Sequence, residues 1–498
     1  KHHVTGLLGY EYYQRDNNYF RAENSGFGTD ATHENNLGGG NAPKMSSSKD
    51  RRKDISGFGR VDYSFDDKYL ATVTLRRDGS SVFGGNNKYA YFPGVSVGWK
   101  IDKEDFMAGA ADKVDILKLR LGYGQSGNSG IDPYQSLSKY DMTTNGILGQ
   151  NKVSGATLTN YMENPDLKWE TTSQVNLGID YGFFSRLSGN LDFFVKNTKD
   201  MLVQVSQSPM TGHKYQWQNA ASMRVWGLEY SLNSTNIQTR DFEWDTQLSF
   251  SWTDNKITDY NVTDESTVAA LNTIGVIKGE RTNSYYTYVI DGIDPSSGSY
   301  RFKDLDGDGS ITVKDKAILG TPDPRVILGF GNTFKYKNFA LDIFFNANFG
   351  NKMYNYSAMN FTLPNTFETS NYMVDAMNYW SESNPNSDIA ANRANGNGNA
   401  LYNSRWIEDA WFIRLQNVTL SYNLASIPSL RKIFPTAKIY VQAQNLFLIT
   451  PYSGLDPELA NNAYMSSSEN LPAFLPGSVD MNAYPPARTF TVGLNFSF

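Results

Sequence analysis

The 498-residue chain contains no cysteine, only four histidines and no excess of basic residues. Without cysteine there is neither a disulfide framework nor thiol chemistry. The net charge of −6 and the pI of about 5.4 come without a basic stripe, so nucleic-acid binding has no electrostatic support. No run approaches about 18 apolar residues, which excludes membrane-spanning helices.

Catalytic constellations are missing as well. The histidines are His2, His3, His33 and His213, and no zinc-ligand spacing connects them. No G-x-S-x-G nucleophile elbow is present. The run GFGRVD at 57–62 lacks the strand-to-helix context of a phosphate-binding loop. The sequence therefore predicts that this chain is not an enzyme.

The chain is instead rich in aromatic residues, and apolar and polar residues alternate along many of its segments. Aromatics make up 14% of the residues, carried mainly by 31 tyrosines and 29 phenylalanines. Such residues favour strands, and they form the girdles of transmembrane barrels. The mean hydropathy of −0.49 is compatible with a membrane barrel, because a barrel strand shows lipid only every second residue.

The clearest strand is the last one, RTFTVGLNFSF, which has a strict period of two. Its polar face carries small residues, as expected of a wall that lines a lumen. A terminal aromatic strand resembles the assembly signal of bacterial outer-membrane barrels. The residues on its apolar face are Phe490, Val492, Leu494, Phe496 and Phe498.

About fourteen segments of roughly 10–14 residues share this pattern, and a tilted membrane strand needs about 9–11. A soluble chain of this length would be expected to split into about three domains. No such split is visible, so residues 1–498 are predicted to form part of one transmembrane β-barrel domain. The predicted strands are 4–14, 52–65, 68–78, 90–101, 115–126, 170–183, 187–198, 224–236, 242–256, 326–336, 338–349, 408–423, 437–447 and 488–498.

The connections between these segments alternate between short and long. Short turns include Asp66-Asp67, 184–186 and 337–338, and long connections include 257–325 and 350–407. Short turns on one side and long loops outside are the rule for bacterial outer-membrane barrels. Residues 284–292 look like a strand but would break this parity, so they are predicted to be a β-excursion within an extracellular loop. The opening KHHVTGLLGYEYY already alternates and is no targeting segment, so we expect that Lys1 is not the native start.

One loop motif carries recognisable chemistry. The segment DLDGDGSITVKD, from Asp304 to Asp315, fits a calcium-binding loop with its turn glycine at Gly309. Such loops usually have a bidentate glutamate at the position of Asp315. The aspartate side chain is shorter by one methylene. A structural Ca²⁺, or another hard cation, is expected in this extracellular loop; the alternative is an acidic turn without metal. The predicted metal ligands are Asp304, Asp306, Asp308, Ser310, Thr312 and Asp315.

Three tryptophans near a loop and a strand end, Trp380, Trp406 and Trp411, are interpreted as interfacial anchors, with stacking on a ligand as the alternative. The loop 384–400, rich in Asn and Gly, is expected to be a solvated loop. No substrate-binding residue can be assigned from the sequence.

Several segments, in family order and spread over nearly the whole chain, resemble the SusC-like (SusC/RagA) subfamily of TonB-dependent outer-membrane transporters. These segments are 57–101, 117–134 (LKLRLGYGQSGNSGIDPY), 164–184 (NPDLKWETTSQVNLGIDYGFF), 301–325, 412–424 (FIRLQNVTLSYNL), 440–450 and 485–498 (PPARTFTVGLNFSF).

The resemblance implies an all-β, antiparallel barrel of 22 strands in the outer membrane of a Gram-negative bacterium, with an N-terminal plug inside it. It also implies import of an oligosaccharide or peptide, energised through TonB, with a SusD-like surface lipoprotein as a lid. This chain shows no TonB box and no plug, and about eight strands are missing from the barrel count. A second, cleaved N-terminal chain, or a truncated N-terminus, is expected to account for them. The alternatives are a passive porin or surface scaffold, and a soluble multi-sheet adhesin or glycan-binding protein.

Overall fold

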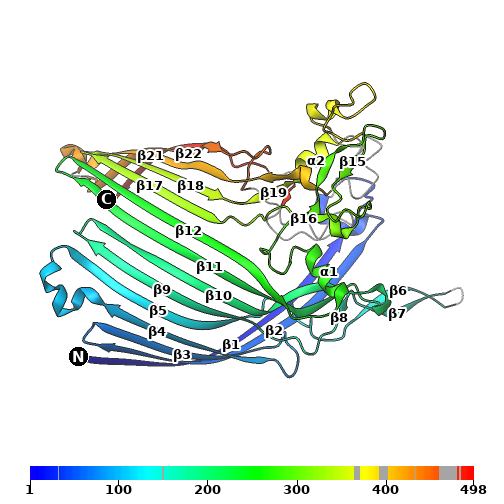
Figure 1. Ribbon diagram of the computed structural model, residues 1–498, viewed down its shortest axis with the longest axis horizontal. Coiled ribbons are helices and arrows are strands. Elements are labelled where there is room, and N and C mark those ends of the chain that lie inside the picture. The colour runs from blue at the N-terminus through cyan, green and yellow to red at the C-terminus, as the bar shows by residue number, and fades with distance from the viewer. Residues whose placement is uncertain are drawn as a thin grey trace.

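The computed structural model describes residues 1–31, 33–148, 151–363, 371–391, 402–431, 433–458, 479–481 and 484–497, without the side chains of 34 and 141–157. Fourteen strands follow one another in an antiparallel sheet, and the short strand β8 (Tyr161–Met162) adds to β11 in parallel. Figure 1 shows them side by side in a curved wall, with both chain termini at the same end. The prediction of about fourteen strands is confirmed.

Every sequence neighbour in this wall is also a spatial neighbour, as in an up-and-down barrel. The fourteen strands are β1 (His2–Glu23), β2 (Lys44–Phe65), β3 (Tyr69–Ser80), β4 (Tyr89–Lys100), β5 (Val114–Asn128), β9 (Glu170–Phe183), β10 (Leu187–Ser206), β11 (Tyr215–Gln238), β12 (Phe242–Tyr260), β17 (Val326–Tyr336), β18 (Phe339–Phe349), β21 (Phe412–Asn423), β22 (Thr436–Ile449) and β24 (Thr489–Ser497).

The connections have the predicted asymmetry. Asp66 and Asp67, both with φ of 55°, close β2 to β3, and Phe184 and Ser185, with φ of 57° and 51°, close β9 to β10. Two successive residues of positive φ match the twist of a hairpin, which is why such turns are short. Segment 284–292 forms β13 (Tyr286–Tyr288) and most of β14 (Ile290–Ile293), which pair outside the wall as predicted. We call the two ends of the wall the short-turn end and the long-loop end.

Six of the strand predictions were wrong in their bounds, five in length and one in continuity. Strands β1, β2, β10, β11 and β12 run for 22, 22, 20, 24 and 19 residues, well beyond the predicted 10–14. Pairing continues past the membrane because a neighbouring strand satisfies the backbone there, although the hydrophobic alternation has ended. Segment 408–423 is two elements, since β20 (Ile407–Asp409) leaves the wall to pair with β19 (Lys352–Asn355).

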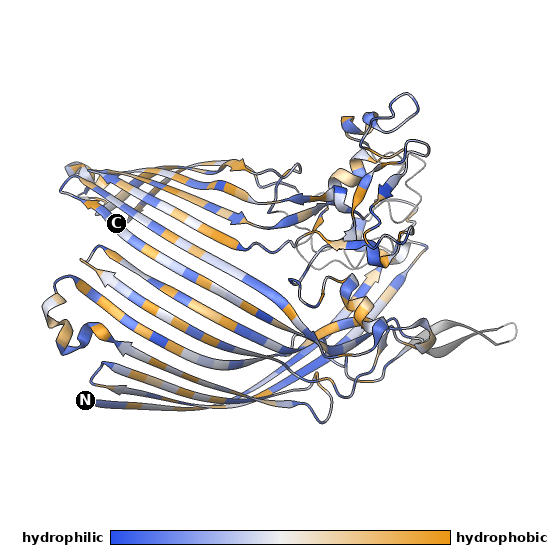
Figure 2. Ribbon diagram, in the orientation of Figure 1, coloured by the Kyte–Doolittle hydropathy of each residue, from blue (hydrophilic) through white to orange (hydrophobic). Residues whose placement is uncertain are grey.

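The two faces of the wall have opposite polarity, visible as alternating bands along each strand in Figure 2. On one face, large apolar side chains lie directly opposite one another from strand to strand. An unbroken belt of this kind suits hydrocarbon. One such row runs through Ala71, Val97, Leu121, Leu177, Phe193, Leu228 and Trp252.

The other face is polar and internally neutralised. Arg120 on β5 donates hydrogen bonds to both oxygens of Asp180 on β9, each at 3.0 Å, and to Asp192 on β10 at 2.9 Å. A Cβ at Gly178, which lies between them, would come within 2.3 Å of Asp192 and 2.7 Å of the guanidinium of Arg120. Glycine at this position leaves room for an ion-pair network that spans three strands.

The described helices are short, and none of them is long and apolar enough to cross a membrane. They lie in the connections: α1 (Glu265–Thr273), α2 (Tyr356–Thr362) and α3 (Pro428–Arg431). Figure 1 places α1 and α2 at the long-loop end.

Leu177 tests the assignment of the apolar face. Replacing it with arginine should cost about 2–4 kcal/mol of unfolding free energy, because a charge would lie against hydrocarbon near the middle of a strand. Urea unfolding of the protein in lipid vesicles, followed by gel mobility, measures the change. The neighbouring substitution Asn176→Ser, on the polar face, is the control. Equal effects of the two substitutions would contradict the assignment.

Candidate functional site

The long-loop end carries a folded layer of its own. Figure 1 shows α2, β15, β16 and β19 gathered beside the ends of the wall strands. Three small sheets build this layer: β13 with β16 (Lys316–Ile318), β14 with β15 (Tyr300–Phe302), and β20, β19 and β23 (Val479–Asp480). The strands come from three different connections of the wall, so the loops are tied to one another.

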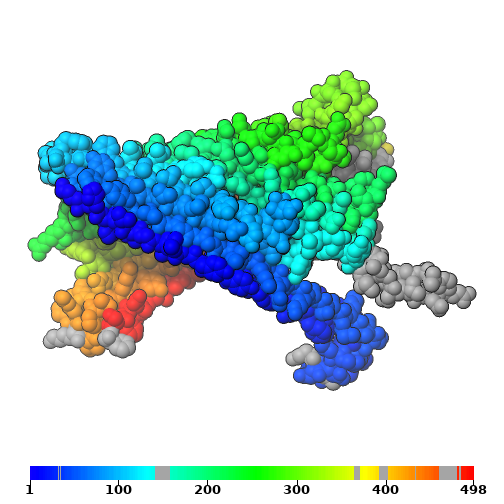
Figure 3. All heavy atoms as spheres, turned by 90° about the horizontal axis from the view of Figure 1, so that it is seen from below, coloured from blue at the N-terminus to red at the C-terminus, as the bar shows by residue number. Residues whose placement is uncertain are grey.

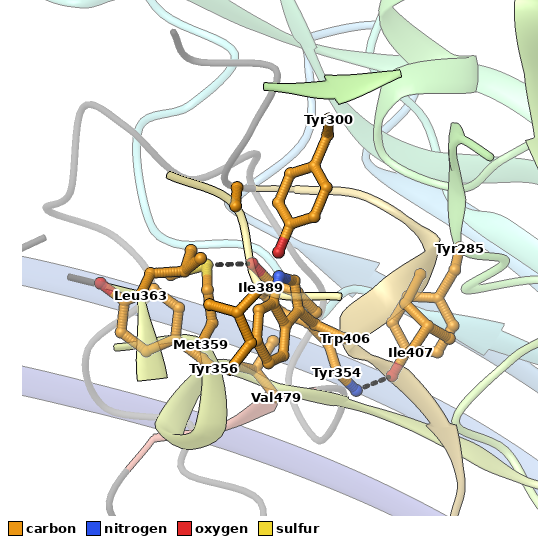
Figure 4. Close-up of a cluster of buried hydrophobic side chains, with 11 residues drawn as sticks. Tyr285, Tyr300, Tyr354, Tyr356, Met359, Leu363, Ile389, Trp406, Ile407 and Val479 are labelled. Atoms are coloured by element: carbon orange, nitrogen blue, oxygen red, sulfur yellow. Dashed lines mark hydrogen bonds between the residues drawn. The ribbon is translucent and has the colours of Figure 1, made fainter. Parts of the chain in front are cut away.

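A buried aromatic cluster holds these loops together (Figure 4). The backbone N–H of Tyr354 donates to the hydroxyl of Tyr285 at 3.2 Å, and the hydroxyl of Tyr354 donates to the sulfur of Met359 at 3.2 Å. Burial of one large apolar side chain stabilises a fold by about 1.5–3 kcal/mol, so such a cluster makes the layer a stable body. Its buried members are Tyr285, Tyr300, Tyr354, Tyr356, Met359, Leu363, Ile389, Ala390, Trp406, Ile407 and Val479.

The tryptophan interpretation was wrong for two of three residues. Trp380 and Trp406 are each only 4% exposed, so they neither stack on a ligand nor anchor an interface. Trp411 stacks with Phe349 at a centroid distance of 6.0 Å. Residues 392–400 of the predicted solvated loop lie outside the described residues, as does Phe498.

The acidic loop lies between β15 and β16, two strands of the small sheets. Asp304 accepts hydrogen bonds from the backbone N–H groups of Gly307 at 2.7 Å and Gly309 at 2.8 Å. Both glycines have positive φ, +74° and +82°, in open space. Their backbone conformation, rather than crowding, therefore requires glycine, and it turns the loop around the carboxylate of Asp304.

Asp315 closes the loop from its far end. Its side chain is fully buried and accepts hydrogen bonds from the backbone N–H groups of Leu305 and Thr312, each at 2.7 Å. With Thr312 it forms a capping box at the start of a short 3-10 helix. The hydrogen bond from the Thr312 N–H, followed by those from Leu305 and Asp306, holds the pKa of Asp315 below its ordinary value despite burial.

Three of the predicted ligands converge. One carboxylate oxygen from each of Asp304, Asp306 and Asp315 lies within 4.8 Å of the others. Within the described ranges, no other group of three or more acidic or histidine side chains is arranged in this way. Among the described residues, one ion pair reaches these carboxylates, from the exposed ammonium of Lys314 to Asp306 at 3.9 Å. Three hard oxygen donors with so little compensating charge suit Ca²⁺.

Of the four predicted carboxylate ligands, Asp308 is not brought into this group. Asp308 is exposed, and its carboxylate accepts from the N–H of Ser310 at 2.8 Å. The hydroxyl of Thr312 accepts from the N–H of Lys314 at 3.2 Å and lies 3.4 Å from Asp315, so it serves as a helix cap. The geometry therefore supports three of the six predicted positions directly.

A buried ion pair that the sequence reasoning missed joins the loop layer to the wall. Arg414 on β21 is 4% exposed and donates to both carboxylate oxygens of Asp456 at 2.7 Å. Its Nε also lies 2.7 Å from Glu458. These charge-assisted contacts, from Nη2 to Asp456 and from Nε to Glu458, fix the loop after β22 against the polar face of the wall. No periodic signal marks these residues, because they are 42 positions apart in the chain.

Comparison with known proteins gives consistent results. Residues 2–446 match the family model described as TonB dependent receptor-like, beta-barrel. TonB-dependent receptor P3 of Formosa agariphila is 33% identical over the whole chain and 51% of its own length. TonB-dependent receptor SusC of Bacteroides thetaiotaomicron is 31% identical over 89% of the chain and 44% of its length. A chain of the RagAB peptide transporter superposes with a TM-score of 0.82 at 26% identity, covering all of this chain and 53% of that one. The chain thus spans about half the length of these relatives.

Substitution of Asp315 tests its role in shaping the loop. In Asp315→Asn the N–H groups of Leu305 and Thr312 lose a charged acceptor, so their amide hydrogen exchange should accelerate by roughly tenfold or more. Exchange followed by mass spectrometry measures this, with Asp308→Asn as the matched control. Since the pKa of Asp315 is lowered in the fold, the same protection should be present at neutral pH and be lost as the pH falls through that lowered pKa. Equal exchange in both variants would contradict the role of Asp315.

Proposed function

Because the chain belongs to the SusC-like TonB-dependent receptor barrels, outer-membrane proteins of Gram-negative bacteria, we propose that it is the barrel wall of a nutrient importer. The observation that carries the proposal is the wall itself. One face is apolar from strand to strand, and the other is polar and carries neutralised charges such as Arg120 with Asp180 and Asp192. Such a wall separates hydrocarbon from a polar interior.

The remainder of the protein would complete this barrel. Strands β1 and β24 each have one neighbour in the described sheet, and an open sheet edge is unstable in lipid. We propose that an N-terminal part, on the same or a separate chain, supplies about eight strands and a plug, toward the 22-stranded barrel that the family resemblance implies. The plug would carry the TonB contact through which import is energised.

The loop layer is the part of the chain that we propose meets the substrate and a SusD-like surface lipoprotein. Its aromatic core and its tether through Arg414 make it a preformed surface above the barrel mouth. The substrate class proposed is an oligosaccharide or a peptide. The RagAB transporter, named for peptides, supports the second of these, and the sequence resemblance supports both.

We further propose that the acidic loop holds a structural Ca²⁺. Asp304, Asp306 and Asp315 would supply carboxylate oxygens, with Asp308, Ser310 and Thr312 completing the shell directly or through water. The cation would neutralise three converging carboxylates and thereby stiffen the connection between β15 and β16. Its role is structural rather than catalytic.

Terbium luminescence checks the cation site. The full-length protein should sensitise Tb³⁺ emission through nearby tyrosines, and Ca²⁺ should displace the Tb³⁺. Asp304→Asn combined with Asp306→Asn should abolish the signal, because two of three converging carboxylates lose their charge. Asp291→Asn, an exposed acid in the same layer, is the control. Unchanged Tb³⁺ binding in the double variant would remove the cation from the proposal.

Uptake by cells tests the transport function. Deleting the gene for this protein should reduce uptake of one labelled oligosaccharide or peptide from a screened panel to background. Deleting TonB should do the same, because the import is proposed to be energised. Uptake that is lost with this gene but persists without TonB would favour a passive porin. The absence of any affected substrate would favour a surface scaffold.

A further inference from the structure

Two consecutive arginines of β3, Arg76 and Arg77, lie on opposite faces of the wall. Arg76 points to the polar face, where it pairs with Asp78 at 2.6 Å and Glu11 at 3.1 Å. Arg77 points to the apolar face and lies over two tyrosine rings, 4.2 Å from the centroid of Tyr89 and 5.8 Å from that of Tyr91. Within the described residues Arg77 has no carboxylate partner, although its guanidinium is exposed.

Register places Arg77 at the border of the apolar belt. It lies opposite Gly57 on β2 and Tyr91 on β4, and Gly57 in turn lies opposite Tyr10 on β1. On the same face, Val73 lies opposite Val61 and Val95, four residues or about 13 Å closer to the short-turn end than Arg77. Aromatic girdles occupy this level in membrane barrels, where hydrocarbon gives way to headgroups.

The surroundings of Arg77 are open. No described heavy atom lies within 4 Å of the position that a Cβ of Gly57 would occupy, which leaves a hollow between Tyr10 and Arg77. The ring of Tyr89 lies flat against Gly79, with a closest approach of 2.4 Å to a Cβ built there. The exposed Lys53 lies on β2 four residues nearer the long-loop end than Gly57, on the same face. It also has no ion-pair partner among the described residues.

A second pair of cations lies on the same face of two other strands. Arg224 on β11 and Lys256 on β12 are exposed and directly opposite one another. Trp252 lies on the same face, four residues nearer the belt than Lys256. Like charges directly opposite each other in a sheet are destabilising unless an anion lies between them.

Two described acids on this face already have basic partners. Asp16 is paired with Arg51, and Asp254 is paired with Arg281 at 3.0 Å. Within the described residues, the cations Arg77, Lys53 and Lys256 therefore have no carboxylate partner, and Arg224 donates a hydrogen bond to the neutral side chain of Asn197 at 2.7 Å. We call Lys53, Arg77, Arg224 and Lys256 the outer cationic belt.

We propose that the outer cationic belt binds phosphate groups on lipid headgroups of the extracellular leaflet. The guanidinium fork of arginine matches phosphate oxygens, and lysine adds a point charge. The tyrosine rings present an apolar body to the acyl chains and a hydroxyl to the headgroup. Figure 3 shows the strands from β1 to β5 as one continuous surface, and the register of β2, β3 and β4 places Arg77 in line with the apolar side chains of that wall. This continuity with hydrocarbon favours a lipid over a protein partner.

Lipid retention in native mass spectrometry tests the proposal. The full-length protein is purified in detergent, stripped of lipid, and mixed with diphosphoryl lipid A or with the same lipid after removal of its phosphates. Wild-type protein should retain the phosphorylated lipid at least about fivefold more than the dephosphorylated one, given the attraction of each cation for an anionic headgroup. Lys53→Gln combined with Arg77→Gln should remove most of that preference.

The control is Arg186→Gln combined with Arg240→Gln, which removes two exposed charges at the short-turn end. It should retain the phosphorylated lipid like the wild type. Lys53→Arg combined with Arg77→Lys should also retain it, and heat-dependent gel mobility verifies that each variant barrel is folded. Equal retention of both lipids by the wild type would overturn the proposal. So would equal losses in the belt variant and the short-turn variant.

Discussion

The hydrocarbon of the membrane imposes the constraint on which the rest of this structure depends: each backbone N–H and C=O within it needs a partner in the sheet. Fourteen strands meet this requirement by pairing with their sequence neighbours. Tight turns of positive φ, such as Asp66-Asp67, allow the chain to return at once on one side. On the other side the chain is free of that limit, and the loops there grow into small sheets and helices.

The same constraint sorts the side chains. A strand alternates its faces, so one face must be apolar and charges must gather on the other. There they neutralise one another, as Arg120 does with Asp180 and Asp192. Arg76 and Arg77 show both outcomes on adjacent residues. The first is paired on the polar face, and the second lies over Tyr89 at the border of the apolar belt, with no carboxylate partner among the described residues.

The loop layer lies outside the membrane, so water can accept and donate the hydrogen bonds that its backbone groups lack. It depends on a hydrophobic core of its own, in which Tyr285, Tyr354 and Val479 come from three connections of the wall. This core keeps β15 and β16 in place, and so it presents the acidic loop in one conformation. Asp315 takes part in both tasks, since its buried carboxylate caps a helix turn and faces Asp304 and Asp306.

The sequence by itself determined the number of wall strands, their order, the side on which the turns are tight, and the identity of the acidic loop. All of these rest on local patterns: a period of two, turn residues and a spacing of oxygen donors. Only the tertiary structure decided where β1 and β12 end, that Trp406 is buried, and that Arg414 meets Asp456. Those features arise from contacts between residues far apart in the chain, and outside the membrane no repeating pattern of hydrophobicity records which segments will meet.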